Sequence, residues 1–271
     1  MRKTEFIETI KDMATQFGEV EIQKIEKADG AYTGLAIKVP SGVPTPVVNL
    51  DLMYEQYLIN DLPIEEVFKQ VKKILTMRPD MELKPKDITN WDKARTKLYL
   101  RPFGHISGGI NQQVEDIYLV PYLELAGNGS AMVRVTPQLI NAWGVDEETV
   151  FRVARENQEE IRPATITSMS ELIGLPAPFP MYVVSTENQA FGASAIFYDG
   201  IEEKIRDRMG GDFYILPSSV HEVIVIPRNI EGSIEELEEM VTMINGTAVD
   251  ECDRLTNSVY VFEDNELTKV S

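Results

Sequence analysis

The sequence predicts an α+β fold in which mixed or antiparallel sheets pack with helices. Segments with alternating or continuous apolar residues, typical of strands, share the chain with segments of helical apolar spacing. These segments do not follow one another as a long run of regular strand–helix–strand units, which argues against a parallel sheet. With 271 residues, 43% of them hydrophobic and 26% charged, the chain can form one large domain or two smaller ones.

The N-terminal part predicts a helix, a β-hairpin and a pair of helices. Residues 2–17 have helical apolar spacing, and Gly18 ends that run. Apolar and polar residues alternate on both sides of Asp29-Gly30, a dipeptide typical of tight hairpin turns, so strands are expected over 19–28 and 31–39. The loop SGVPTP and the short strand VVNLD then lead into helices expected near 51–60 and 64–77.

A lysine- and proline-rich stretch, MRPDMELKPKD, follows the second of these helices. Such a composition is typical of a connection between domains. It predicts a helical and hairpin part over residues 1–85 and a larger α+β domain over 86–271, unless the two form one continuous domain. A short helix is expected at about 86–96.

The larger part predicts strands and helices in an irregular order. A helix begins at Pro137 and ends at Gly144, and Asp146 caps the next helix over 147–160. The segment DGIEEKIRDRMGG is a helix ended by glycine, and SIEELEEMVTMIN is a helix with the capping box Ser233 and Glu236. The predicted strands are KLYLRPF, EDIYLVPYLEL, SAMVRVT, MYVVS, FGASAIFY, DFYILP and VHEVIVIP, with SVYVFE opening a closing hairpin.

The chain is strongly acidic, with a formal net charge of −18. This charge repels a phosphate backbone, so direct binding to nucleic acid is not expected. The segment from Lys69 to Arg101 carries +6, which leaves −24 for the rest. This local excess of basic residues predicts solvated helix faces. Alternatively, it predicts a basic patch that binds an acidic partner or a second copy of the chain in a homo-oligomer.

Cysteine usage and hydropathy predict a cytoplasmic protein without a membrane partner. No stretch approaches the roughly twenty apolar residues of a membrane span, and the N-terminal segment is amphipathic rather than signal-like. The single Cys252 excludes an intrachain disulfide and a cysteine-cluster zinc site. A reducing compartment fits this usage.

The polar segment Ser218-Ser219-Val220-His221-Glu222 separates two apolar strands and holds one of the two histidines. In an extended strand Ser219 and His221 would share one face, with Ser218 and Glu222 on the other. Pro217 instead favours a bend in which the serines satisfy backbone groups. We therefore expect these four polar residues to form a binding surface or a structural hydrogen-bond cluster.

A catalytic interpretation requires Ser219, His221 and Glu222 to converge in a pocket. No G-x-S-x-G elbow surrounds either serine, and His221-Glu222 lacks the second histidine of a zincin motif. A metal site is a weaker alternative, in which His105 of the loop FGHISGG would join His221 and a distant acid. That loop lacks the lysine and the strand-to-helix context of a phosphate loop, and no motif implies a cofactor.

Four elements of the C-terminal half carry a family resemblance: EDIYLVPYLEL; VTPQLINAWGVDEETVFRVARENQ; FGASAIFYDGIEEKIRDRMGGDFYILPSSVHEVIVIP; and SIEELEEMVTMIN with LTNSVYVFEDNEL. In this order they resemble an uncharacterised bacterial domain-of-unknown-function family relatable to the YtpQ-like proteins. The resemblance covers roughly residues 97–270, and FYILPSSVHEVIVIP is its most specific element. It implies a compact, soluble, intracellular α+β domain and no reaction. It also places Ser218, Ser219, His221 and Glu222 at the family signature, for folding or for function.

Function is expected to be binding rather than catalysis. The favoured hypothesis is an acidic, non-catalytic protein-binding or accessory factor with a protein partner. One form of it is an inhibitor, carried by a phage or mobile element, that masks a nucleic-acid-binding host protein by acidic mimicry. The alternative is a hydrolase or metal-dependent enzyme that uses Ser219, His221 and Glu222.

Overall fold

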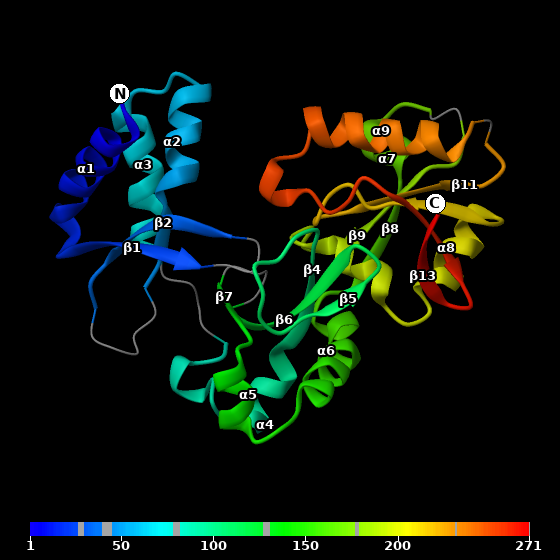
Figure 1. The fold of residues 1–271 in the computed structure, drawn as a ribbon, viewed down its shortest axis with the longest axis horizontal. Helices are drawn as coiled ribbons and strands as arrows, with labels where there is room; N and C mark the ends of the chain where they lie inside the picture. Colours follow the sequence, from blue (N-terminus) through cyan, green and yellow to red (C-terminus); the bar gives the residue numbers. More distant parts are fainter. Residues whose placement is uncertain are drawn as a thin grey trace. The chain divides into compact units, whose positions relative to one another are not determined.

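The computed structural model describes residues 1–26, 30–39, 45–77, 82–126, 131–176, 179–230 and 232–270. These residues form an α+β fold whose sheets are antiparallel, which confirms the predicted fold class (Figure 1). The chain divides into two compact units. The first comprises Met1–Asp80 with Lys84–Lys86, and the second comprises Met81–Leu83 with Asp87–Ser271.

The first unit packs helices against a three-stranded sheet of order β1-β2-β3. The predicted hairpin is confirmed, because Val20 pairs with Ile37 and Glu26 pairs with Ala31, although Asp29 of its expected turn lies outside the described residues. Its elements are α1 (Lys3–Ala14), the 3-10 turn η1 (Thr15–Phe17), β1 (Val20–Glu26), β2 (Ala31–Ile37), β3 (Val47–Asn49), α2 (Leu50–Ile59) and α3 (Ile64–Leu75).

The second unit contains a four-stranded sheet in which β6 pairs with the three other strands. The predicted helix caps are confirmed: Asp146 Oδ1 accepts from the Thr149 N–H, and Gly144 ends its helix in the left-handed conformation. The helix expected over 86–96 is instead three short pieces. The 3-10 turn η2 (Pro85–Asp87) lies where the chain passes from the first unit to the second. The other elements of this region are α4 (Trp91–Ala94), η3 (Arg95–Lys97), β4 (Leu98–Phe103), β5 (Gln112–Val114), β6 (Ile117–Ala126), β7 (Ala131–Arg134), α5 (Pro137–Trp143) and α6 (Glu147–Ile161).

A six-stranded sheet of order β13-β12-β10-β11-β9-β8 completes the second unit. The capping box of Ser233 and Glu236 and the closing hairpin are both confirmed. The elements here are β8 (Ala164–Ser168), α7 (Met169–Ile173), β9 (Tyr182–Thr186), η5 (Gly192–Phe197), α8 (Ile201–Met209), β10 (Phe213–Leu216), β11 (Val223–Pro227), α9 (Ile234–Thr247), η6 (Glu251–Asp253), β12 (Val259–Glu263) and β13 (Glu266–Val270).

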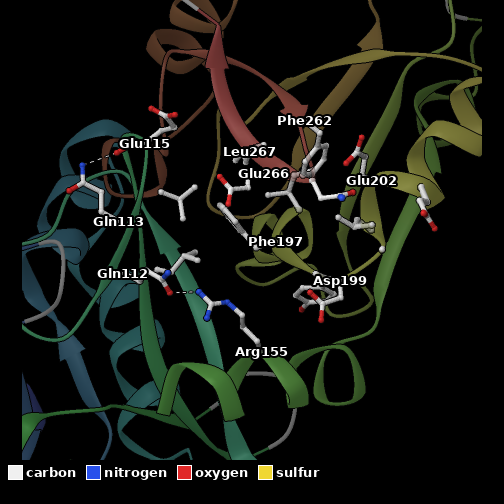
Figure 2. Close-up of a pocket in the computed structure, with 18 residues that line it drawn as sticks. Gln112, Gln113, Glu115, Arg155, Phe197, Asp199, Glu202, Phe262, Glu266 and Leu267 are labelled. Atoms are coloured by element: carbon white, nitrogen blue, oxygen red, sulfur yellow. Dashed lines mark hydrogen bonds between the residues drawn. The ribbon is translucent and has the colours of Figure 1, made fainter. Parts of the chain in front are cut away.

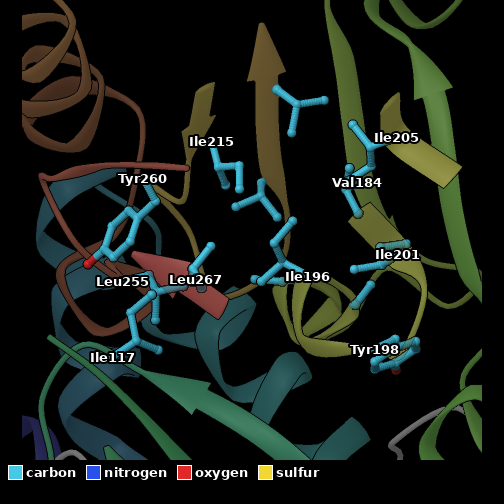
Figure 3. Packing of buried hydrophobic residues seen from close by; sticks show 14 of the residues in the cluster. Ile117, Val184, Ile196, Tyr198, Ile201, Ile205, Ile215, Leu255, Tyr260 and Leu267 are labelled. Carbon is cyan, nitrogen blue, oxygen red and sulfur yellow. The ribbon is translucent and has the colours of Figure 1, made fainter. Parts of the chain in front are cut away.

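Both faces of this sheet are buried, which explains the continuous apolar runs of its central strands. Ile215 and Val225 pack with η5 and α8, as Figure 3 shows for Ile215. Their neighbours Leu216 and Ile226 face the other way and pack with α9. Because successive side chains of a strand point to opposite faces, a sheet covered on both sides needs apolar residues at every position.

The segment FGASAIFY is not the strand that its apolar residues predict, because residues Gly192–Phe197 form the 3-10 helix η5. Small side chains allow this helix to approach β9 closely. A Cβ atom on Gly192 would lie 2.1 Å from Ser185 Oγ and 2.6 Å from the His221 carbonyl oxygen. The run is apolar because it is buried on several sides, and a short buried helix and a buried strand have the same composition.

Among the described residues, no helix combines the length and the apolar character needed to cross a membrane. The longest elements of the second unit are amphipathic helices that pack on sheets. The apolar side chains of these helices pack in the hydrophobic clusters of the second unit.

Candidate functional site

The segment Ser218–Glu222 forms a bend between β10 and β11 and is not an extended strand. The alternative of an extended strand, in which Ser219 and His221 would share one face, is therefore not what the structure shows. Ser219 Oγ accepts a hydrogen bond from the His221 N–H (3.0 Å), and the Ser218 carbonyl accepts one from the Leu255 N–H (3.0 Å). Both serines are buried. The bend predicted from Pro217, with serines satisfying backbone groups, is what the structure shows.

His221 is half-buried, and both of its ring nitrogens face groups of the protein. Nε2 lies 3.4 Å from Asp253 Oδ2, and Nδ1 of the neutral ring accepts a hydrogen bond from the Phe191 N–H (3.2 Å). The hydrogen bond with Asp253 raises the pKa of His221, although partial burial acts in the opposite direction. Conversely, the same hydrogen bond lowers the pKa of Asp253.

This geometry gives no support to a nucleophilic serine. A serine nucleophile needs a base against its hydroxyl group. The Ser219 hydroxyl instead contacts a backbone amide, while the imidazole faces Asp253 and Phe191. Glu222, the third member of the predicted constellation, is exposed to solvent.

The structure also gives no support to the predicted metal site. His105 is exposed in the loop after β4. Within the described ranges, no group of three or more histidine, cysteine, aspartate or glutamate side chains is placed to hold a metal ion. His105 and His221 are therefore not joined in a described ligand set.

A cleft of about 700 Å³ in the second unit is the better candidate site, and we call it the acidic cleft. Carboxylates outnumber cations along its walls, since Arg155 is the one cationic residue among those that line it. The acidic lining residues are Glu115, Asp199, Glu202, Glu203 and Glu266.

The acidic residues reach the cleft from three separate parts of the fold. Glu115 follows β5, and Asp199 to Glu203 span the junction of η5 and α8. Glutamates in the first turn of α8 are favoured there because the amino end of a helix attracts negative charge. Glu266 begins β13, directly after a hairpin turn at Asp264-Asn265 in which both residues have positive φ.

The floor of the acidic cleft is apolar and belongs to the hydrophobic core. Ile196, Tyr198, Ile201 and Leu267 line the cleft and also pack in the core beneath it (Figure 3). Phe197 and Phe262 add partly exposed rings to the walls. A molecule in the cleft would therefore meet rigid apolar surface below and carboxylates around the rim.

The charges of the cleft are unevenly distributed. Figure 2 shows Arg155 hydrogen-bonded to Gln112 on one side, with Glu202 and Phe262 on the other. Glu202 Oε1 accepts a hydrogen bond from Arg206 Nη2 (2.6 Å), whereas the buried Oε2 has no hydrogen-bond partner among the residues that the structure describes.

The four exposed acidic residues of the cleft leave its rim negative. These residues are Glu115, Asp199, Glu203 and Glu266. Their carboxylates form no ion pair with any other described residue. Their charges therefore remain available to a cation that enters from solvent.

The predicted site residues do not line this cleft, and no spacing in the sequence indicated it. Its carboxylates come from three segments between Glu115 and Glu266, so only the fold brings them together. The one local signal is the run YDGIEE, which supplies Asp199, Glu202 and Glu203.

Comparison with known proteins identifies a family without assigning a function. Neither a curated protein nor a solved structure matches the chain. A family model matches residues 3–264, nearly the whole length, and this match shows no link to the YtpQ-like proteins. The protein therefore belongs to DUF5688, a family of unknown function.

Proposed function

We propose that the protein is a non-catalytic binding protein that holds a basic segment of a partner protein in the acidic cleft. The observation that carries this proposal is the composition of the cleft: five carboxylates and one guanidinium around an apolar floor. A concave surface of one charge sign focuses its electrostatic field and concentrates ions of the opposite sign. A cationic segment is therefore the complementary ligand.

The size and floor of the cleft favour a peptide segment over a free inorganic cation. A volume of about 700 Å³ is in the range of sites that bury small organic groups. Lysine and arginine side chains have long aliphatic stems that pack on apolar surface while their charged ends stay polar. The floor residues Ile196 and Leu267 offer that surface.

Several narrower forms of the proposal remain predictions. An acidic inhibitor of a nucleic-acid-binding host protein is one of them, since such a partner also has a basic face. A cytoplasmic location, a relation to the YtpQ-like proteins and pairing with a second copy of the chain are others. No contact in the structure favours a hydrolase or a metal-dependent enzyme over the binding role.

Calorimetric titration of the full chain with a peptide of alternating lysine and glycine tests the proposal. We expect binding that weakens as salt is added, because the carboxylates of the rim are screened. A matched peptide of alternating glutamate and glycine should not bind. Absence of binding by the lysine peptide at low salt would remove the proposal.

A pair of double variants separates the cleft from the overall charge. Glu115→Gln with Glu266→Gln removes two rim carboxylates, whereas Glu171→Gln with Glu239→Gln removes two exposed carboxylates elsewhere. The cleft variant should weaken binding about threefold to tenfold, the range of two exposed charge pairs. Equal weakening by both variants would mean that net charge, and not the cleft, attracts the peptide.

A further inference from the structure

On the basis of the proposed function, we infer that the acidic cleft recognises a lysine ammonium group, which Glu202 and Phe262 receive. The inference names the group that is bound, whereas the proposed function requires only a basic segment. It starts from an incompletely satisfied carboxylate beside an aromatic ring.

Glu202 has a buried acceptor without a donor. Its side chain is 10% exposed, and Oε2 is buried with no hydrogen-bond partner in the described part of the chain. A buried polar atom without a partner is unfavourable, and the effect is larger for a charged group. The terminal torsion of a glutamate is broad, and the Arg206 side chain is 46% exposed and can follow it. A partial rotation can therefore present Oε2 to a donor in the cleft while Oε1 keeps its hydrogen bond with Arg206.

Phe262 supplies a second attraction for a cation. Its ring lies on the same side of the cleft as Glu202 (Figure 2). The ring and that of Phe213 form a T-shaped pair, with the centroids 6.1 Å apart and the planes at 72°, which restricts the orientation of Phe262. A cation near the face of an aromatic ring is attracted by the ring quadrupole.

The remaining carboxylate oxygen favours an ammonium over a guanidinium. Arginine binds a carboxylate best through two parallel hydrogen bonds, one to each oxygen. Glu202 Oε1 already accepts from Arg206, whose Nε also lies 3.6 Å from Asp212 Oδ1. One free oxygen suits the compact ammonium of lysine, which needs no paired acceptors.

The test compares a lysine–glycine peptide with an arginine–glycine peptide of equal length on the full chain. We expect the lysine peptide to bind at least about threefold more tightly. Glu202→Gln should weaken lysine binding about tenfold, in the range of a hydrogen bond to a charged group, and should affect the arginine peptide less. Glu171→Gln, an equal change of charge on an exposed residue outside the cleft, is the control.

A second variant keeps the inference testable if Glu202→Gln fails to fold. Phe262→Leu preserves apolar contact but removes the aromatic face, and it should weaken lysine binding about twofold to fivefold. Equal binding of both peptides, with neither variant altering it, would overturn the inference and leave the proposed function standing. If neither peptide binds the native chain, both proposals fail.

Discussion

The Ser218–Glu222 bend and the acidic cleft use polar residues in opposite ways. In the bend, Ser219 and both ring nitrogens of His221 are engaged with groups of the protein itself. In the cleft, Glu202 Oε2 is without a hydrogen-bond partner among the described residues, and there the rim carboxylates make no ion pair. The polar groups of the bend therefore contact other groups of the fold, whereas the rim carboxylates are exposed, and this contrast supports the proposed binding role of the cleft.

The largest expected effect is on the packing beneath the bend. Gly192→Ala places a Cβ atom 2.1 Å from Ser185 Oγ and 2.6 Å from the His221 carbonyl oxygen. Because backbone must move to accept it, we expect a loss of about 3 kcal/mol in the free energy of unfolding. Urea denaturation measures this loss. Gly211→Ala, where a Cβ atom meets nothing within 4 Å, is the control, and an equal loss in both variants would contradict the packing argument.

A smaller effect is expected from the ion pair in the bend, and it should depend on pH. The pKa of His221 is raised, so its contribution is complete below its unfolded pKa of about 6.5 and is lost as pH rises through the folded pKa. The pKa of Asp253 is lowered, so its contribution is complete above its unfolded pKa of about 3.9 and is lost as pH falls through the folded value.

The contribution of the pair to stability is therefore complete from about pH 4 to about pH 6.5 and declines beyond these limits. We expect the free energy of unfolding of the His221→Gln variant to lie below that of the native chain at pH 6. This difference should become smaller as the pH rises to 9. Both side chains are about one-third exposed, so solvent screening should keep the ionic part of the effect below about 1 kcal/mol. Protonation of Nδ1 also ends the hydrogen bond that it accepts from the Phe191 N–H, which further limits the effect. A stability difference that stays constant over this range would contradict a charged pair.

The smallest effect on stability is expected in the acidic cleft. Glu115→Gln with Glu266→Gln should change the free energy of unfolding by less than about 0.5 kcal/mol, because both residues are exposed and neither carboxylate forms a described ion pair. A large loss of stability would show that these carboxylates support the fold, and the contrast with the bend would fail.

Local signals in the sequence were sufficient to predict much of the fold. The Ser233–Glu236 capping box, the glycines that end helices at Gly144 and Gly210, and the alternation across the first hairpin each act within a few residues. These signals depend on backbone geometry and hydrogen bonds near the residue itself. The division into domains over 1–85 and 86–271 stays a prediction.

Other elements depend on residues that are distant in the sequence, so they could not be predicted from their own segments. The 3-10 helix η5 is set by the approach of Gly192 to Ser185 and His221. The strand β8, which pairs with β9 at the sheet edge, has only two apolar residues, Ala164 and Ile166, that pack on the core, so its apolar signal in the sequence is weak. The acidic cleft was missed for the same reason, since its walls meet only after the six-stranded sheet has formed.

The apolar floor of the acidic cleft is also part of the hydrophobic core, and this has an evolutionary consequence. Ile196, Ile201 and Leu267 belong to the core as well as to the cleft, so a mutation that changes their shape also disturbs folding. Glu115, Asp199 and Glu203 are exposed, so substitution there is limited more by ligand binding than by folding. Relatives should therefore keep the hollow while exchanging its rim charges, and their choice of ligand should diverge faster than their architecture.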